Sequence, residues 1–188
     1  GASSGIGKAT AIECSKLGAK VVITGRNVER LNETYLALYG EDHAQIIADL
    51  ATIDGIDSLI SQIPTLNGCV LNAGISKLAL TQFIKEDDLK GILQVNTISP
   101  IMLTQRLVKK KKVAKGSSIV FTSSIAGNFT VSFGHAMYAI SKGGINSFMK
   151  SAALDLASKG IRCNSVNPGM VQTKLIQSGT LTDEQLQA

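Results

Sequence analysis

The sequence predicts an α/β fold, a doubly wound parallel sheet with helices on both faces. Short apolar runs rich in β-branched residues alternate with helix-length periodic segments, which is typical of βαβ units joined by right-handed crossovers. Glycine is frequent, at 18 of the 188 residues, and only 4% are aromatic, a composition that suits tight turns between packed elements. No repeat, linker or low-complexity tract interrupts the pattern, so residues 1–188 are expected to form one domain.

The expected strands and helices can be placed from hydrophobic periodicity and from the glycines and prolines that end each segment. Strands are expected at residues 21–24, 45–48, 68–71, 118–122 and 161–166. Helices are expected over residues 6–17, 28–38, 53–63, 87–112 and 138–159. The segment 87–112 is read as one or two helices, because Pro100 fits a helix break or a first-turn position.

Charge and cysteine content exclude several classes of function. The net charge of +5 lies largely in Lys109–Lys112 and Lys115 at an expected helix end, and no aromatic residues are interleaved with it, so no nucleic-acid site is expected. The three cysteines are far apart and have no histidine ligands nearby, which favours buried thiols in a reducing compartment and no metal. There is no apolar run of about 18 residues and no secretory leader, so we expect a cytoplasmic protein that does not bind membranes.

Polar and glycine-containing clusters directly follow all the expected strands. Because the carboxyl ends of parallel strands meet at one edge of a sheet, where ligands of such folds bind, these clusters are expected to share one site. The clusters are Gly25-Arg26, Asp49-Leu50, Asn72-Ala73-Gly74, Ser123-Ser124 and Asn167-Pro168-Gly169.

The opening loop is expected to bind phosphate. Gly1, Gly5 and Gly7 allow close approach of the backbone to an anion, and the helix that begins near Ile6 offers free N–H groups and its positive dipole end. The spacing is G-x-x-x-G-x-G, which differs from the usual dinucleotide fingerprint, and three glycines alone can also form a simple tight turn. The strand expected at residues 21–24 favours the phosphate-binding reading.

The residues after that strand indicate which dinucleotide binds. An acidic side chain at this position would form a hydrogen bond with the ribose 2′-hydroxyl of NAD(H), whereas an arginine would bind the 2′-phosphate of NADP(H). Gly25 stands where the acid would be, and Arg26 follows. The sequence therefore favours NADP(H) over NAD(H), with an arginine that merely caps a surface turn as the alternative.

Tyr138 and Lys142 form a candidate proton-transfer pair. They are four residues apart in an expected helix and so lie on the same face, one turn apart. An ammonium near a phenol favours the phenolate, so we expect Lys142 to lower the Tyr138 pKa from about 10. A tyrosine tuned in this way can exchange a proton with a substrate oxygen. Taken alone, the same spacing also describes a surface pair on a solvated helix.

The motifs together resemble those of the short-chain dehydrogenase/reductases, in the family's order and over nearly the whole chain. They are residues 1–7, Leu71-Asn72-Ala73-Gly74, Asn96, Ser124, Tyr138-x-x-x-Lys142 and the segment from Pro168 to Thr173. The resemblance implies a Rossmann-like fold, a catalytic tetrad of Asn96, Ser124, Tyr138 and Lys142, and no metal. It also implies that the cofactor is bound by Gly1, Ser3, Ser4, Gly5, Ile6, Gly7, Arg26, Asp49, Leu50, Asn72, Ala73, Gly74, Tyr138, Lys142, Pro168, Gly169, Val171 and Thr173.

Individual roles follow from the same resemblance. Ser124 would hold the substrate oxygen, and Tyr138 would protonate it as hydride arrives from the nicotinamide. Lys142 would also bind the nicotinamide ribose, and Asn96 would hold a water that links Lys142 to solvent. Asp49 would contact the adenine. His135, by its place in the preceding loop, is expected to line the entrance.

The chain departs from the family pattern at three places. Ser124 and Tyr138 have thirteen residues between them, one more than usual, which leaves Ser123 as the alternative to Ser124. Ser4 stands where relatives that prefer NADP often have a basic residue. Relatives also begin with a strand before the first glycine and continue beyond residue 188, so the domain is expected to be incomplete at both ends.

The expected activity is hydride transfer between NADP(H) and a carbonyl or alcohol substrate. A 3-oxoacyl thioester competes with sugars, polyols and steroids, and the apolar content of residues 125–133 and 170–176 favours a hydrophobic substrate. An NAD(H)-dependent dehydrogenase of the same family and a non-catalytic dinucleotide sensor are the alternatives. By resemblance, the protein is expected to be a homotetramer or homodimer.

Overall fold

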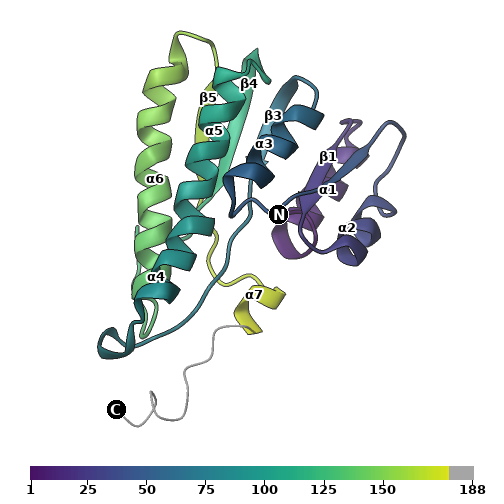
Figure 1. Cartoon of the computed structure of the whole chain (residues 1–188). Helices are drawn as coiled ribbons and strands as arrows, with labels where there is room; N and C mark the ends of the chain where they lie inside the picture. Colours follow the sequence, from purple (N-terminus) through teal and green to yellow (C-terminus); the bar gives the residue numbers. More distant parts are fainter. Residues whose placement is uncertain (178–188) are drawn as a thin grey trace.

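The computed structural model describes residues 1–177, which form an α/β structure of five parallel strands and intervening helices (Figure 1). The strands are β1 (Val22–Gly25), β2 (Ala44–Ile47), β3 (Leu66–Leu71), β4 (Val113–Thr122) and β5 (Arg162–Val166). The helices are α1 (Gly5–Lys16), α2 (Val28–Tyr35), α3 (Ile53–Gln62), η1 (Thr81–Phe83), α4 (Glu86–Leu93), η2 (Gln94–Ile98), α5 (Ser99–Lys109), α6 (Ala136–Ala157) and α7 (Lys174–Gln177).

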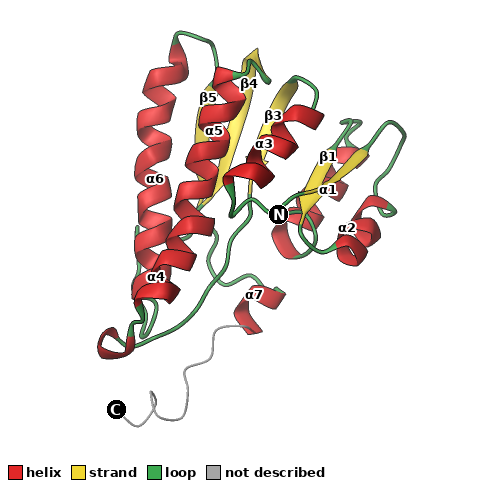
Figure 2. Cartoon of the chain, viewed as in Figure 1, coloured by secondary structure: helices red, strands yellow, loops and turns green. Residues whose placement is uncertain are grey.

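All five predicted strands are confirmed, and the alternation of strand and helix is the predicted one (Figure 2). Two helices begin at side-chain caps: Asn27 Oδ1 accepts from Arg30 N at the start of α2, and Thr52 Oγ1 accepts from Gly55 N at the start of α3. The predicted segment 87–112 is divided into α4, one π-helical turn at η2, and α5. Pro100 lies in the first turn of α5, where its missing N–H costs little.

The sheet has two hydrogen-bonded parts in the described residues, β1-β2 and β3-β4-β5, rather than the single sheet predicted. Gly1 lies between them (Figure 1): its ammonium donates to Thr24 O at 2.8 Å, and its carbonyl accepts from Asn72 Nδ2 at 2.9 Å. The ends of β1 and β3 are therefore joined through the glycine loop and Asn72, not through a strand-to-strand ladder.

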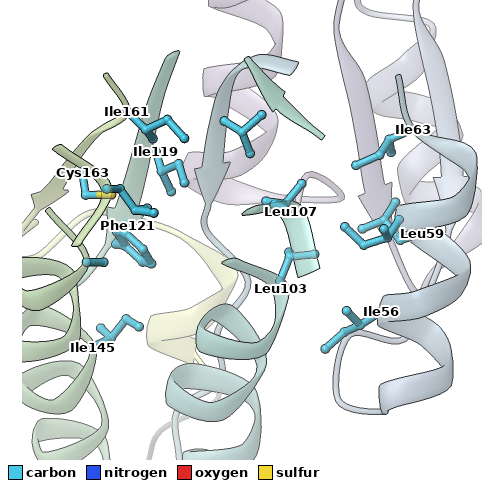
Figure 3. Packing of buried hydrophobic residues seen from close by; sticks show 14 of the residues in the cluster. Ile56, Leu59, Ile63, Leu103, Leu107, Ile119, Phe121, Ile145, Ile161 and Cys163 are labelled. Atoms are coloured by element: carbon cyan, nitrogen blue, oxygen red, sulfur yellow. The ribbon is translucent and has the colours of Figure 1, made fainter. Parts of the chain in front are cut away.

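The main core lies between β3-β4-β5 and the helices α3, α5 and α6, which cover one face of these strands (Figures 1 and 3). Ile119 and Phe121 of β4 are fully buried there, and the Phe121 ring meets that of Phe148 on α6 edge-on at 5.9 Å. A smaller core of Ala11, Ile23 and Leu31 joins α1, β1 and α2. The core thus fixes α6 against β4, which positions Tyr138 and Lys142 beside the end of that strand.

Within residues 1–177, no helix has the length and apolar character needed to cross a bilayer.

Candidate functional site

The clusters that follow the strands meet at one edge of the molecule, as the sequence predicts. Gly25 lies close to the glycine loop, since a Cβ at Gly25 would be 3.4 Å from Ser3 Oγ. Gly74 lies close to Asn96 and Lys142, since a Cβ at Gly74 would be 3.4 Å from both Asn96 Oδ1 and Lys142 Nζ. The segment that follows β5 joins the same edge, because Ile125 N donates to Pro168 O at 3.1 Å. The glycine loop, the Asn72–Gly74 turn and the Ser124 loop therefore surround a common site.

The glycine loop has the features of an anion site. The helix α1 begins at Gly5, whose positive φ of 53° suits glycine, and within the described residues the N-cap Ser4 makes no side-chain capping bond. The first N–H groups of α1 therefore remain available to phosphate oxygens. A hollow of about 350 Å³ lies beside this loop. Its lining consists of Ser3, Ser4, Gly5, Lys8, Arg30, Glu33, Gln172, Thr173 and Lys174. A second hollow, of about 420 Å³, lies away from the loop.

Two of the predicted glycines are required by packing. A Cβ at Gly1 would lie 2.6 Å from Ala73 N, and one at Gly7 would collide with the carbonyl oxygen of Gly1. The loop can thus pack tightly against the Asn72–Gly74 turn only because these residues lack a side chain. The residues present fit a dinucleotide whose pyrophosphate lies at the start of α1.

Arg26 and Asp49 lie next to each other at the ends of β1 and β2. The Arg26 Nη1 to Asp49 Oδ1 distance is 3.9 Å, and the side chains are 63% and 47% exposed. Asp49 Oδ1 also accepts from Ala51 N at 3.0 Å, which fixes the carboxylate. The neighbouring Leu50 packs against the main core, so its side chain points away from the site and only its backbone can face a cofactor.

Tyr138 lies at the start of α6 with Ser124 and Lys142 beside it. The Ser124 side chain lies close enough to the Tyr138 phenol to lower its pKa, and Ser124 Oγ accepts from Ala126 N at 3.1 Å. Lys142 Nζ lies 5.7 Å from the centroid of the Tyr138 ring. Ser123, the alternative to Ser124, is buried and donates to Lys142 O at 2.9 Å, so its hydroxyl does not face the phenol.

The expected lowering of the Tyr138 pKa by Lys142 is not seen, because Lys142 is not among the groups that shift this pKa. Burial raises the pKa of the Tyr138 phenol above its ordinary value, and the Ser124 side chain lowers it by less. The Lys142 ammonium is directed at Thr122 O, to which it donates at 2.7 Å, and burial lowers its own pKa from 10.5 to about 8. The phenol is therefore held in its protonated form, which suits a proton donor.

Asn96 lies fully buried in the η2 turn and makes three hydrogen bonds. Its Oδ1 accepts from Ile75 N at 2.8 Å, and its Nδ2 donates to Ile75 O at 2.9 Å and Ser141 Oγ at 3.0 Å. Because both ends of the amide are engaged, the side chain clamps the segment after Gly74 to α6. Both Nδ2 hydrogens are used, so a water held by the Asn96 side chain would have to donate to Oδ1.

Three further groups at this site were missed in the sequence. Thr122 receives the Lys142 ammonium, Ser141 joins Asn96 to α6, and Asn128 donates to Ser124 O at 2.9 Å. Asn128 lies in the loop that follows a predicted strand, and this location is the feature of the sequence that could have indicated a role at the site. The predicted entrance residue His135 holds Phe133 O through Nδ1 at 2.9 Å, and its ring meets the Tyr138 ring edge-on at 6.4 Å.

The segment from Pro168 to Thr173 borders the glycine loop. A Cβ at Gly5 would lie 3.1 Å from Thr173 Cγ2, and one at Gly169 would lie 3.6 Å from Ile125 Cδ1. Val171 is 41% exposed. Among residues 1–177, no three His, Cys, Asp or Glu side chains gather in a way that could hold a metal ion.

Comparisons with known proteins agree with this arrangement. The family model described as short chain dehydrogenase matches residues 1–184. The 3-oxoacyl-[acyl-carrier-protein] reductase FabG of Rickettsia bellii is 32% identical over 188 residues, which are 100% of this chain and 76% of that protein.

Two solved structures are similar as well. A short-chain dehydrogenase/reductase from Caenorhabditis elegans, solved with a cofactor, is 33% identical with a TM-score of 0.82, over 100% of this chain and 73% of that one. A 3-ketoacyl-(acyl-carrier-protein) reductase from Brucella melitensis, complexed with NADH, is 25% identical with a TM-score of 0.85, over 96% of this chain and 77% of that one. The chain belongs to the short-chain dehydrogenase/reductase family, oxidoreductases that bind NAD(P) and act on carbonyl and alcohol groups.

Proposed function

We propose that this protein is an NADP(H)-dependent reductase of 3-oxoacyl thioesters. The observation that carries the proposal is the arrangement at the start of α6, where the Ser124 side chain lies close enough to the Tyr138 phenol to lower its pKa and Lys142 Nζ lies 5.7 Å from the centroid of the phenol ring. A protonated phenol beside a hydroxyl can protonate a carbonyl oxygen that becomes an alkoxide. The bound nicotinamide would supply the hydride.

The chain's own residues then have distinct tasks. Ser124 orients the substrate carbonyl by donating to its oxygen, and Tyr138 donates the phenolic proton to that oxygen. With a pKa of about 8, Lys142 remains largely protonated at neutral pH, so its charge stabilises the phenolate left on Tyr138. Asn96 keeps η2 and the Gly74 segment in register with α6, and its backbone would hold the water that returns a proton to Lys142.

The proposed choice of NADP(H) is supported by charge at the adenosine end. Arg26 follows β1 and is 63% exposed, so its guanidinium is accessible to a 2′-phosphate. Asp49 is fixed by Ala51 N and would contact the adenine. Gly1, Ser3, Ile6 and Gly7 would hold the pyrophosphate and ribose together with the Asn72–Gly74 turn. One observation favours NAD(H) instead: the Brucella melitensis reductase was solved with NADH.

Exposed apolar side chains in the loop before α6 and in the segment after β5 support a hydrophobic substrate, and we call them the apolar rim. We define this rim as Phe129, Val131, Phe133 and Met170, which are 74%, 88%, 87% and 89% exposed. Exposed apolar side chains grouped near a reactive site are typical of a surface that binds an apolar ligand. An acyl chain extending from the thioester would fit such a rim, whereas a sugar or polyol would leave it in water. The relative named FabG is a 3-oxoacyl-[acyl-carrier-protein] reductase.

The proposal is tested by following oxidation of NADPH and NADH with three substrates: a short 3-oxoacyl thioester, a ketosteroid and a keto sugar. We expect the thioester and NADPH to give the highest kcat/KM. A higher kcat/KM for the sugar or the steroid would overturn the substrate class. A preference for NADH would overturn the cofactor assignment and leave the reductase itself intact.

A further inference from the structure

Four polar side chains behind Ser124 form a closed ring of hydrogen bonds. Asn128 Nδ2 donates to Asn167 Oδ1 at 3.2 Å, and Asn167 Nδ2 donates to Ser165 Oγ at 3.3 Å. Ser165 Oγ donates to Asn146 Oδ1 at 2.6 Å, and Asn146 Nδ2 donates to Asn128 Oδ1 at 3.1 Å, which closes the ring. Each member donates to the next in one direction around the ring, an arrangement in which each bond polarises the following one.

The ring joins three elements that are distant in the sequence. Asn128 belongs to the loop after β4, Asn146 to α6, and Ser165 to β5, with Asn167 just beyond that strand. All four side chains are half-buried. Asn128 donates through Nδ2 to Asn167 and accepts through Oδ1 from Asn146. These two bonds distinguish the nitrogen end of the amide from the oxygen end, so the ring determines the orientation of the Asn128 amide.

The Asn128 amide connects this ring to the candidate catalytic residues. An asparagine NH₂ has two hydrogens, and the shortest bond that Asn128 Nδ2 makes is to Ser124 O, at 2.9 Å. The same nitrogen lies 3.3 Å from Ser123 Oγ, which in turn donates to Lys142 O at 2.9 Å. The ring is therefore linked to the backbone of Ser124 and, through Ser123, to that of Lys142.

We propose that Asn128 is a positioning residue, oriented by this ring, that holds Ser124 at the Tyr138 phenol. The inference rests on the proposed function. Backbone bonds hold the residues on either side, Ser123 N to Val166 O at 2.9 Å and Ile125 N to Pro168 O at 3.1 Å, whereas the Ser124 carbonyl is held by the Asn128 side chain. A bond from an oriented amide to the Ser124 carbonyl adds a constraint at Ser124 itself.

The first test is kinetic. Asn128→Ala, and Asn128→Asp, which keeps the shape and loses the donors, are expected to lower kcat about tenfold to a hundredfold. The NADPH Kd should stay within about twofold, which also shows that the variants fold. Asn164→Ala is the matched control, since Asn164 lies on β5 with an exposed side chain, and it should behave as the parent does. A kcat for both Asn128 variants within about twofold of the parent would overturn the proposal.

A double-mutant cycle separates positioning from general stabilisation. If Asn128 acts through Ser124, Asn128→Ala will not lower kcat further in a Ser124→Ala background. If it lowers kcat by the same factor in both backgrounds, the proposed link to Ser124 is wrong. Asn146→Ala, which opens the ring and retains the Asn128 donor, is expected to give a smaller loss than Asn128→Ala.

A second readout needs no turnover and so remains decisive if the proposed function fails. The Tyr138 pKa is obtained from the ultraviolet titration of the parent minus that of Tyr138→Phe. The Ser124 side chain lowers this pKa, so Asn128→Ala should raise it in the same direction as Ser124→Ala does. An unchanged Tyr138 pKa in Asn128→Ala would contradict the inference, whereas an inactive parent would contradict only the proposed reaction.

Discussion

At the β1-β2 end of the site the charged side chains lie in water, whereas at the β4-α6 end they are buried. Arg26 and Asp49 are 63% and 47% exposed and 3.9 Å apart. Lys142 is 4% exposed, donates to a backbone carbonyl and has a pKa lowered to about 8. Exposed charges are screened and can exchange partners, which suits selection among cofactors. Buried ones keep a fixed geometry and altered proton affinity, which suits chemistry.

The largest effect should come from the buried end, with Tyr138→Phe. Removal of the phenolic hydroxyl is expected to lower kcat about a hundredfold to ten-thousandfold, because the phenol is the proposed donor of the proton to the substrate oxygen. The NADPH Kd, measured by fluorescence, should change by less than about threefold. Tyr39→Phe, an exposed tyrosine near Lys16, is the matched control and should retain parent activity. A Tyr138→Phe variant with parent kcat would contradict the assignment of the proton donor.

The second effect concerns stability and pH. The folded-state pKa of Lys142 is about 8 and its unfolded value is 10.5, so between these values the unfolded chain binds more protons and stability rises with pH. The free energy of unfolding of the parent minus that of Lys142→Met should therefore increase by up to about 1.4 kcal/mol per pH unit above pH 8. The subtraction removes the opposing contributions of Tyr138 and Cys69, whose pKa values are raised by burial.

Denaturant titrations between about pH 7 and pH 10 measure this difference. Lys150→Met is the control, since Lys150 is exposed on the same helix, and its difference from the parent should not vary with pH in this way. A flat difference for Lys142→Met would show that the ammonium is not desolvated.

The third effect comes from the exposed end. Arg26→Asp is expected to shift the ratio of kcat/KM for NADPH over NADH at least tenfold toward NADH, because a charge-assisted bond to the 2′-phosphate is replaced by repulsion. Arg162→Asp makes the same charge change at the start of β5, at the opposite end of the strand from the site, and should leave the ratio unchanged. An unchanged ratio in Arg26→Asp would rule out Arg26 as the cofactor determinant.

The smallest effect is on stability at the exposed end. Since exposed ion pairs contribute about 0–1 kcal/mol, Arg26→Ala should change the free energy of unfolding by less than about 0.5 kcal/mol. Urea unfolding at neutral pH measures this value. A loss of several kcal/mol would mean that Arg26 has a structural role and that the contrast between the two ends is false.

The sequence predicted the elements, and it named residues that the structure brings to one edge of the molecule, because local patterns encode both. Hydrophobic periodicity located all five strands, and the i, i+4 spacing of Tyr138 and Lys142 placed both on α6. Pro100 correctly indicated an irregularity in segment 87–112, although the π-helical turn at Asn96 was not predicted. The catalytic and cofactor-binding roles of all these residues remain predictions.

The Tyr138 pKa and the long-range hydrogen bonds of the site were not predicted, because they depend on tertiary packing. The Tyr138 pKa is governed by burial, which outweighs its neighbours, and burial is decided by how α6 packs on β4. The bond from Lys142 to Thr122 O joins residues 20 positions apart, and the bond from Asn128 to Asn167 joins residues 39 positions apart. No local spacing in the sequence indicates such contacts.

The separation of tasks between the two ends is tested most directly by one set of measurements on Arg26→Asp, Tyr138→Phe and the double variant. For each, kcat is measured with a 3-oxoacyl thioester at saturating cofactor, and Kd is measured for NADPH and NADH. The account predicts that Arg26→Asp alters only the ratio of the two Kd values, that Tyr138→Phe alters only kcat, and that the double variant shows both changes in full. A Tyr138→Phe variant with an altered Kd ratio and undiminished kcat would contradict it.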